Sequence, residues 1–327
     1  MLYGGVFSFW QNERERRMKV LIVGGAGDVG KYLTKDFSNL GHEVVVLDRA
    51  VKTEEIERLS ITYFQGSLTD GSIVKEAIQG TDVVINLAWS FADEPQAIFG
   101  EDIQGHINLL EATSQSGIKS FIYTSTATVY GHAVLHPVTE THPCLIGDAR
   151  KPLYALGKYT AEELCRYYHK ERSLPVTIFR FWWAFGENIE GRHLRDLIRK
   201  SLVHQPLEMV RGAGGTFVTM ADLGRAMTSA IARSTGSGQI YNLGSLFLTW
   251  EDIGAMIVNL THSKSSIQLV PSDQWKGPAF LNEVWDLNWD KAKHDLGYEP
   301  NLPAEKIRSL FIEALLKCVD QVMREEK

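Results

Sequence analysis

Short apolar runs alternate with helical patterns through the first half of the chain. The apolar runs are Val20–Val23, Glu43–Leu47, Ile61–Phe64, Asp82–Leu87, Ser120–Thr124 and Val176–Phe181. Short unbroken runs of this kind are typical of buried strands. The segments between them carry apolar residues at helical spacing, as in Tyr32, Leu33, Phe37 and Leu40. This alternation predicts an α/β fold with a doubly wound parallel sheet, which the strand Val176–Phe181 closes.

The regular alternation ends near Ala184. Residues 184–215 and 245–327 combine helical patterns, tryptophans and irregular turns, and we interpret them as a smaller, mixed substrate-binding lobe. Residues 18–183 plus 216–244 are predicted to form the sheet domain, to which 217–232 and 239–243 return. Residues 1–17 are predicted to be a flexible N-terminal extension.

The first apolar run leads directly into three regularly spaced glycines, Gly24, Gly27 and Gly30. In a phosphate-binding turn the first glycine permits the tight turn, the second lets the backbone approach a pyrophosphate, and the third lets the helix pack close to the strand. The helix that follows offers free N–H groups to the phosphates. We interpret Asp28, within this turn, as a helix cap. Taken alone, the glycines also fit a strand-to-helix turn without a ligand.

The second predicted strand ends at Asp48, about twenty residues beyond the glycines. A carboxylate at this place can accept hydrogen bonds from the adenosine ribose hydroxyls and repels a 2′-phosphate. The pattern therefore favours NAD as cofactor. Arg49, the next residue, is able to hold that phosphate instead, so NADP stays open as an alternative.

Charge and composition argue against several kinds of binding partner. The net charge is −6, and no block of basic residues occurs, which argues against nucleic acid and anionic membranes. No apolar run reaches membrane-spanning length. The three cysteines, Cys144, Cys165 and Cys318, have no metal-ligand spacing, so we expect no metal site and a reducing, cytoplasmic location.

The sharpest candidate for catalysis is the pair Tyr154 and Lys158, spaced i and i+4 within a helical pattern. A nearby ammonium stabilises the phenolate and lowers the pKa of the phenol, which otherwise titrates near 10. Thr126 follows the end of a predicted strand, and its hydroxyl is able to bond the same substrate oxygen. Beside a nicotinamide, these groups suit proton removal from an alcohol during hydride transfer, in either direction.

With these motifs in order, the chain resembles the extended short-chain dehydrogenases/reductases, which include the NAD-dependent sugar epimerases and dehydratases. The resemblance covers residues 18–303 and rests on nine stretches. These are Gly24–Gly30, Asn86–Ala88, Gly105–Ala112, Ser125–Gly131, Tyr154–Lys158, Phe179–Phe181, Phe217–Val218 with Asp222, Tyr241–Gly244 and Leu296–Pro300.

The resemblance implies a Rossmann-type NAD(P) domain, a substrate held against the C-terminal lobe, and a homodimer. It implies Thr126, Tyr154 and Lys158 as the catalytic residues. The expected cofactor contacts are Gly24, Gly27, Asp28, Val29, Gly30, Asp48, Arg49, Ser67, Leu68, Leu87, Ala88, Trp89, Thr124, Tyr154, Lys158, Phe181 and Trp183. The expected substrate contacts are Thr126, His132, Trp183 and Arg211.

Several positions depart from the family pattern. Ala127 and Thr128 replace the acidic pair of the 4,6-dehydratases, which argues against dehydration. Nucleotide-sugar enzymes usually carry an arginine just before Phe217, where this chain has 214–216, Gly-Gly-Thr, with Arg211 the nearest cation. Trp183 replaces an asparagine. In addition, Asp102 stands where the family usually has asparagine, and Ser67 where an aspartate usually meets the adenine.

Three functions follow as hypotheses. The first is an NAD-dependent sugar or nucleotide-sugar epimerase in which Tyr154 is the acid and base. The second is a dehydrogenase or reductase of a smaller carbonyl or alcohol, which Trp183 and the missing arginine favour. The third is a dinucleotide-binding regulatory protein without catalysis, against which the intact Tyr154 and Lys158 argue. In each case the partner is a small molecule.

Overall fold

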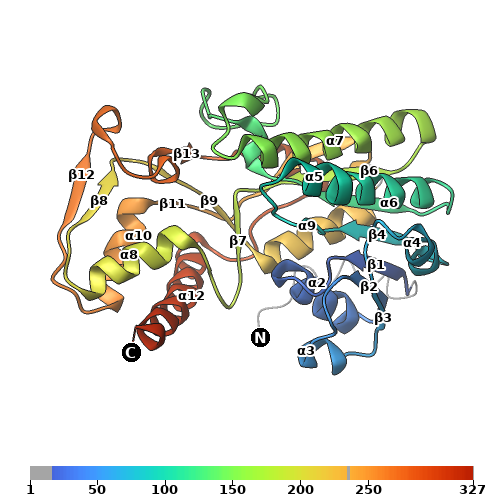
Figure 1. Cartoon of the computed structure of the whole chain (residues 1–327), viewed down its shortest axis with the longest axis horizontal. Coiled ribbons are helices and arrows are strands. Elements are labelled where there is room, and N and C mark those ends of the chain that lie inside the picture. The colour runs from blue at the N-terminus through green and yellow to red at the C-terminus, as the bar shows by residue number, and fades with distance from the viewer. Residues whose placement is uncertain (1–16, 234–235, 327) are drawn as a thin grey trace. The chain divides into compact units, whose positions relative to one another are not determined.

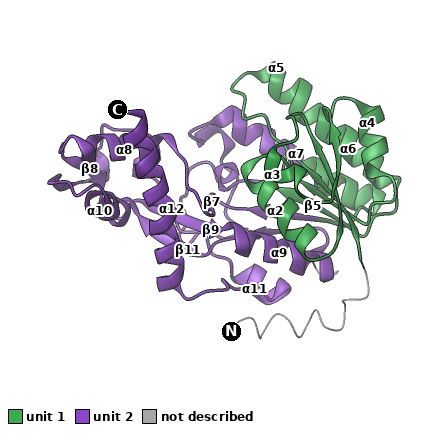
Figure 2. Cartoon of the chain, turned by 90° about the horizontal axis from the view of Figure 1, so that it is seen from below, with its two compact units in different colours: residues 1–124, 163–176 green, residues 125–162, 177–327 purple. Residues whose placement is uncertain are grey.

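A computed structural model describes residues 17–233 and 236–326. The predicted extension 1–17 falls almost wholly outside the described residues. The chain forms two compact units, shown in Figure 2. Unit 1 comprises the residues up to Thr124 together with Glu163–Val176, and unit 2 comprises Ser125–Glu162 and the residues from Thr177 onward. The predicted division into a cofactor domain and a substrate lobe follows other boundaries and stays a prediction.

The predicted α/β fold is confirmed. Seven strands form a parallel sheet in the order β10-β6-β5-β4-β1-β2-β3. Within unit 1, helix α2 lies on one side of the strands and α6 on the other (Figure 1). The strands are β1 (Lys19–Val23), β2 (Glu43–Asp48), β3 (Thr62–Gln65), β4 (Val83–Asn86), β5 (Ser120–Thr124), β6 (Val176–Arg180) and β10 (Gln239–Asn242).

The helices of unit 1 follow the predicted spacing closely. They are α2 (Asp28–Asn39), α3 (Glu54–Glu57), α4 (Gly71–Ile78), α5 (Pro95–Ala97) and α6 (Gln104–Ser114), with α7 (Pro152–Arg172) shared between the units. The helix predicted from Glu101 begins earlier, as a π-helical segment, η1 (Ile98–Ile103). Leu33 and Phe37 of α2 are fully buried, whereas Leu40 lies beyond the helix and is exposed.

Two predictions about the sheet need correction. Val176–Phe181 does not close the sheet, because β10 pairs in parallel with β6 and forms the edge. The return of 239–243 to the sheet is thereby confirmed. Phe217 and Val218, in contrast, belong to β9 (Gly214–Thr219), the centre of a separate four-stranded sheet with β7 (Trp183–Phe185), β11 (Leu246–Thr249) and β13 (Val284–Trp285). A strand of apolar residues looks alike in sequence whichever sheet it joins.

The rest of unit 2 packs around a second core. Helices α8 (Arg192–Leu202), α10 (Trp250–Leu260) and α12 (Ala304–Glu325) contact one another, and β8 (Leu207–Val210) pairs in parallel with β12 (Ile267–Val270). Helices α9 (Met220–Ala232) and α11 (Asp290–Leu296) also pack together. The described residues of this unit also include the short 3-10 turns η2 (Ala127–Tyr130), η3 (Ile146–Asp148), η5 (Ser272–Gln274) and η6 (Ala279–Asn282).

Motifs that lie far apart in the sequence meet in unit 2. The Tyr130 hydroxyl donates to Asn242 Oδ1 at 2.7 Å, and the Ser245 hydroxyl donates to Asp222 Oδ2 at 2.7 Å. A buried ion pair joins Arg180 to Glu162. Breaking a buried pair of this kind costs about 3–5 kcal/mol. In each of these contacts a buried polar side chain of unit 2 has a polar partner, which offsets the cost of its burial.

Candidate functional site

The turn after β1 depends on glycine at two of its three predicted positions. Gly24 has a φ of +80°, and a Cβ there would lie 2.9 Å from the Ala88 nitrogen. A Cβ on Gly30 would lie 2.1 Å from the Gly24 carbonyl oxygen. Neither position has room for a side chain, because both contacts are with backbone atoms. The turn therefore brings the backbone of Gly24 against the segment that follows β4.

Helix α2 begins without a side-chain cap. Gly27 is the N-cap residue, and no side chain bonds the first N–H groups of the helix. The interpretation of Asp28 as the cap was wrong, since Asp28 is already the first helical residue and is exposed. Its negative charge interacts favourably with the positive end of the helix dipole, but its oxygens accept no hydrogen bond from the first N–H groups of the helix. Those groups remain available to an anion. Val29, in the same turn of α2, is half-buried.

Asp48 at the end of β2 is held by two backbone donors. Its Oδ2 accepts from the Ala26 N–H at 2.8 Å, and its Oδ1 accepts from the Ala50 N–H at 2.9 Å. The carboxylate is half-buried, and each oxygen keeps a further lone pair for a ligand. Arg49 points its guanidinium to Glu101, with Nη1 2.8 Å from Oε2. The Asp48 carboxylate can therefore still accept hydrogen bonds from a ligand, whereas the Arg49 guanidinium already has a carboxylate partner.

The other predicted cofactor residues of unit 1 follow strand ends. Leu87, Ala88 and Trp89 come directly after β4 and are half-buried. The Thr124 hydroxyl ends β5 and donates to the Asn86 carbonyl at 3.1 Å. Ser67 bonds the Thr69 hydroxyl at 2.9 Å, and the Leu68 carbonyl accepts from the Asn108 side chain at 2.9 Å. The Gly24 N–H donates to the Leu47 carbonyl at 2.9 Å, and the Leu87 N–H donates to the Val23 carbonyl of β1 at 2.9 Å.

Asp102, one of the departures from the family pattern, has a local role in unit 1. Its two oxygens accept from the Ser90 N–H at 2.9 Å and from the Ser90 hydroxyl at 2.6 Å. These bonds fix the start of the loop that follows Trp89. An ionised carboxylate accepts two such bonds more strongly than an amide does.

The three predicted catalytic residues all lie in unit 2. Thr126 is buried and caps η2, where its hydroxyl donates to the Thr128 hydroxyl at 3.0 Å. Tyr154 and Lys158 are one turn apart in the first part of α7. Lys158 is only 4% exposed, whereas Tyr154 is half-buried. A lysine and a phenol one helical turn apart are residue types that can share in proton transfer.

Ser125, a strand-end residue of the kind that ligands contact in parallel sheets, adds a further polar group. Its hydroxyl is buried and has no hydrogen-bond partner among the described residues. A buried hydroxyl without a partner costs about 1–3 kcal/mol. Its position next to Thr126, just beyond β5, makes a bound ligand a natural partner.

An aromatic cluster occupies the segment after β6. The Trp182 ring stacks on Phe280 with centroids 5.3 Å apart, and Trp183 stacks on Phe217 at 5.5 Å. Glycines make room for both indoles. A Cβ on Gly215 would lie 2.3 Å from Trp182 Cε3, and a Cβ on Gly191 would lie 2.4 Å from Trp183 Cζ2. The Phe181 carbonyl, just before the cluster, accepts from the Ala127 N–H at 3.0 Å. Trp183 is thus packed against neighbours and half-buried.

Ionisable residues that sequence reasoning missed lie on or near Phe280. The Arg150 guanidinium carbon lies 4.6 Å from the Phe280 ring centroid, and the His193 ring stacks on Phe280 at 4.9 Å. Burial, together with the charge of Arg150, lowers the pKa of His193. Burial raises the pKa of Glu283, whose Oε2 accepts from Trp285 Nε1 at 2.8 Å. No local motif marks these residues, because 43 to 133 positions separate Arg150 from His193 and Glu283.

The remaining predicted substrate contacts are exposed. His132 follows Gly131 in the loop after η2, and its electrostatic effect on the pKa of Glu283 opposes the larger effect of burial. Arg211 lies in the turn between β8 and β9. Their roles as substrate contacts stay predictions.

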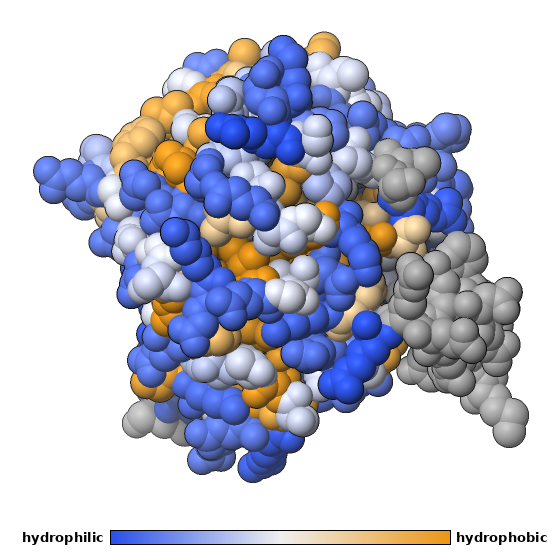
Figure 3. Space-filling model, turned by 90° about the vertical axis from the view of Figure 1, so that its right-hand side faces the viewer, coloured by the Kyte–Doolittle hydropathy of each residue, from blue (hydrophilic) through white to orange (hydrophobic). Residues whose placement is uncertain are grey.

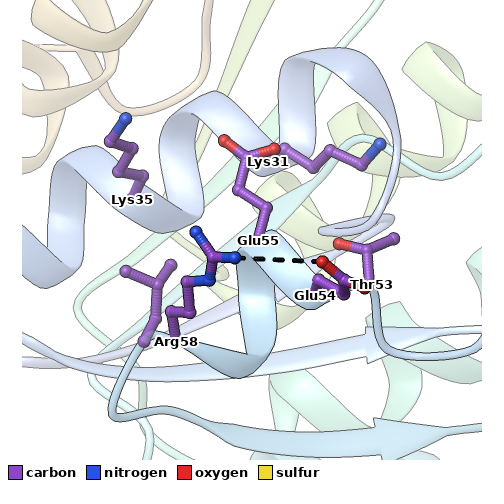
Figure 4. Close-up of a pocket in the computed structure, with 7 residues that line it drawn as sticks. Lys31, Lys35, Thr53, Glu54, Glu55 and Arg58 are labelled. Atoms are coloured by element: carbon purple, nitrogen blue, oxygen red, sulfur yellow. Dashed lines mark ion pairs between the residues drawn. The ribbon is translucent and has the colours of Figure 1, made fainter.

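A pocket of about 510 Å³ lies between α2 and α3 in unit 1 (Figure 4). Lys31 and Lys35 line it from α2, and residues 53–55, 58 and 59 line it from the segment around α3. Arg58 and Glu54 form an exposed ion pair there at 3.8 Å. None of the predicted cofactor or catalytic residues lines this pocket, so it is separate from the candidate chemistry.

The described part of the chain has no helix long and apolar enough to cross a membrane. Within residues 17–233 and 236–326, no group of three or more His, Cys, Asp or Glu side chains is arranged to hold a metal ion. Figure 3 shows one face on which hydrophilic side chains predominate and apolar ones appear between them. A cytoplasmic location stays a prediction.

Comparison with known proteins gives a consistent result. The sequence profile of the NAD dependent epimerase/dehydratase family matches residues 20–244. UDP-glucuronic acid decarboxylase 1 of Danio rerio is 28% identical, over 96% of this chain and 74% of that protein. UDP-glucose 4-epimerase of Haemophilus influenzae is 28% identical over 53% of this chain and 55% of that enzyme, so this match spans about half of each.

Solved structures agree in fold. UDP-glucose 4-epimerase of Thermotoga maritima, with UDP-glucose, has a TM-score of 0.73 at 23% identity and covers 94% of this chain and 99% of that one. UDP-glucuronic acid 4-epimerase of Bacillus cereus, in complex with UDP-glucuronic acid and NAD, has a TM-score of 0.74 at 23% identity. That match covers 93% of this chain and all of the other. At this identity the likeness establishes the fold.

Proposed function

The chain belongs to the NAD dependent epimerase/dehydratase family, and from this premise we propose that it is an epimerase of a nucleotide sugar that uses NAD. The observation that carries the proposal is Tyr154 one helical turn from the buried Lys158, in the same unit as Thr126. The relatives named as UDP-glucose 4-epimerases and UDP-glucuronic acid decarboxylase support a UDP sugar as the substrate class.

The residues of unit 1 fit NAD. Gly24 and Gly30 leave no room for a Cβ, and the uncapped start of α2 offers N–H groups for a pyrophosphate. The carboxylate of Asp48, oriented by the Ala26 and Ala50 N–H groups, suits ribose hydroxyls. The guanidinium of Arg49 is already paired with Glu101, which supports NAD over NADP.

When bound, NAD supplies the acceptor that takes a hydride from the substrate carbon and returns it. The phenolate of Tyr154 takes the proton of the substrate hydroxyl, and the resulting phenol later returns it. The ammonium of Lys158 favours the phenolate form of Tyr154 by Coulomb attraction. The Thr126 hydroxyl bonds the substrate oxygen once it turns from Thr128, which orients that oxygen toward the phenol. Return of the hydride to the opposite face of the sugar gives the epimer, with no net change in the cofactor.

The test is incubation of the purified chain with NAD and a set of UDP sugars, including UDP-glucose and UDP-glucuronic acid. The products are separated by chromatography while the absorbance of reduced nicotinamide is followed. An epimer without net NADH supports the proposal. NADH produced in proportion to product points instead to the alternative, a dehydrogenase. No conversion together with no NAD binding contradicts both.

We also propose a homodimer. Leu156 and Tyr167 of α7 are 41% and 53% exposed, although both are large and largely apolar. They are eleven residues apart, which is about three helical turns and therefore the same face. Light scattering after chromatography tests this proposal, since Leu156→Glu together with Tyr167→Glu is expected to give monomers. A wild-type monomer would contradict it.

A further inference from the structure

The most unusual charged group of unit 2 is the guanidinium of Arg150. It lies on the face of Phe280, 4.6 Å from the ring centroid, and the residue is exposed to solvent. Among the described residues it takes part in no hydrogen bond and no ion pair within 4.0 Å. A guanidinium has five N–H donors in a rigid fork that matches carboxylate or phosphate oxygens. Here that fork faces no protein acceptor.

The platform beneath Arg150 is firmly fixed. Phe280 is only 8% exposed and stacks with both Trp182 and His193. A local hydrogen bond from Trp275 Nε1 to the Pro278 carbonyl at 2.9 Å braces the segment before Phe280. After Phe280, the Gly214 N–H of β9 donates to the Glu283 carbonyl at 3.0 Å. A cation held in one place loses less conformational entropy when it binds an anion than a freely moving surface arginine does.

The ionisable groups that the structure describes near Arg150 do not pair with its guanidinium, so the guanidinium is available to a ligand. Glu283 is the neighbouring carboxylate, but its Oε2 accepts from Trp285 Nε1 and it forms no ion pair with Arg150. His193 has a lowered pKa, which keeps it mainly neutral near pH 7. His132, like Arg150, lowers the pKa of Glu283 electrostatically and so opposes the effect of burial. The positive charge of Arg150 is therefore only partly balanced.

Hydrogen bonds and packing contacts within unit 2 connect this cluster to the candidate catalytic residues. The Ala127 N–H, next to Thr126, donates to the Phe181 carbonyl. Trp182 packs in one cluster with Ala127 and also stacks on Phe280, over which Arg150 lies. Arg150 itself stands four residues before Tyr154, just ahead of α7. The cation is thus linked through Phe280 and Trp182 to the buried cluster that contains Ala127, the residue after Thr126.

We propose that Arg150, held over Phe280, binds an anionic oxygen group of the substrate, either the diphosphate or a carboxylate on the sugar. This inference rests on the proposed function, because it names the contact by which the same site selects its substrate. It also offers a replacement for the cation that the Gly214–Gly215 segment cannot carry, since a side chain on Gly215 would meet the Trp182 indole.

The experiment measures calorimetric affinity of the NAD-loaded full chain for three probes at fixed ionic strength: UDP, UDP-glucose and UDP-glucuronic acid. Arg150→Gln is compared with the wild type and with Arg192→Gln. Arg192 is a matched control in the same unit, 89% exposed at its side chain and 3.9 Å from Asp196. Arg211→Gln tests the rival cation suggested by the sequence.

Loss of a charged hydrogen-bond donor is expected to weaken probe binding about ten- to a hundredfold. Weakening of all three probes by Arg150→Gln supports a diphosphate contact, and weakening of UDP-glucuronic acid alone supports a carboxylate contact. Arg150→Lys keeps the charge without the fork and should recover part of the affinity. Probe affinities within twofold of the wild type in Arg150→Gln, or a loss seen in Arg211→Gln only, overturn the inference.

The affinity for NAD separates this inference from the proposed function. Unchanged NAD affinity in Arg150→Gln shows that the variant is folded. If the wild type binds NAD and interconverts UDP sugars while Arg150→Gln behaves identically, only the role of Arg150 fails. If the wild type binds NAD but none of the probes, both this inference and the nucleotide-sugar substrate fail.

Discussion

The glycine turn of unit 1 and the aromatic cluster of unit 2 are built by different means, and we propose that each binds a ligand. The turn relies on backbone, since Gly24 and Gly30 allow close approach and the first N–H groups of α2 are uncapped. The cluster relies on side chains, with Arg150 and His193 arranged on Phe280. A backbone device is specified by a few adjacent residues, whereas a side-chain device draws on residues from across the chain. The first kind suits a cofactor shared by many enzymes, and the second suits a substrate particular to one of them.

Removing the phenol of Tyr154 should have the largest effect, because it tests whether unit 2 carries chemistry as well as recognition. Tyr154→Phe is expected to lower the turnover of UDP sugars about 10²- to 10⁴-fold, the usual contribution of a general acid and base. NAD affinity should be nearly unchanged. Turnover by chromatography and NAD affinity by calorimetry measure the two effects. Tyr168→Phe is the control, since this phenol on the same helix bonds Glu111; equal loss in both variants would contradict the role of Tyr154.

Gly30→Ala tests the backbone half of the comparison. The new Cβ would lie 2.1 Å from the Gly24 carbonyl oxygen, so the turn must open. We expect NAD affinity to fall at least a hundredfold, measured by calorimetry. Gly71→Ala provides the control, because a Cβ at the start of α4 meets nothing within 4 Å. If Gly30→Ala binds NAD like the wild type, the turn does not hold the pyrophosphate.

Asp48→Asn tests the carboxylate that lies beside the glycine turn and accepts from its Ala26 N–H. The amide can accept from either Ala26 or Ala50 but not from both, and it no longer repels a phosphate. NAD affinity should fall about tenfold, while the ratio of NADP to NAD affinity rises. Competition calorimetry with both dinucleotides measures this ratio. An unchanged ratio would show that Asp48 does not determine the cofactor.

Glu283→Gln should have the smallest effect, and it concerns the stability of the cluster. Burial raises the pKa of Glu283 above its unfolded value, so the folded chain favours the protonated form. The favourable contribution of that form is present below the unfolded pKa and is lost as the pH rises through the folded pKa. The variant should therefore unfold about 1–3 °C higher than the wild type at pH 7, and no higher at about pH 4. Scanning calorimetry at both pH values tests this, and a gain that persists at low pH would contradict the cause.

The same contrast explains what the sequence predicted. The alternation of strands and helices, the glycine turn, and the position of Asp48 all followed from neighbouring residues, and the structure confirms the strands and helix there. The assignment of Asp28 as a cap failed because the helix begins one residue earlier than a cap at that position requires. β9 was placed with the sheet domain because its apolar pattern does not reveal which sheet it joins. Arg150, His193, Phe280 and Glu283 were missed because only the tertiary fold brings them together.

The central claim is that hydride leaves and returns to one substrate carbon while Tyr154 moves the proton. The most direct measurement uses UDP-glucose carrying deuterium at C4 of the sugar, incubated with the NAD-loaded chain and followed by mass spectrometry and NMR. The account predicts the 4-epimer with its deuterium retained at C4 and no accumulation of NADH. Replacement of that deuterium by hydrogen from solvent, or epimer formation at the wild-type rate by Tyr154→Phe, would contradict it.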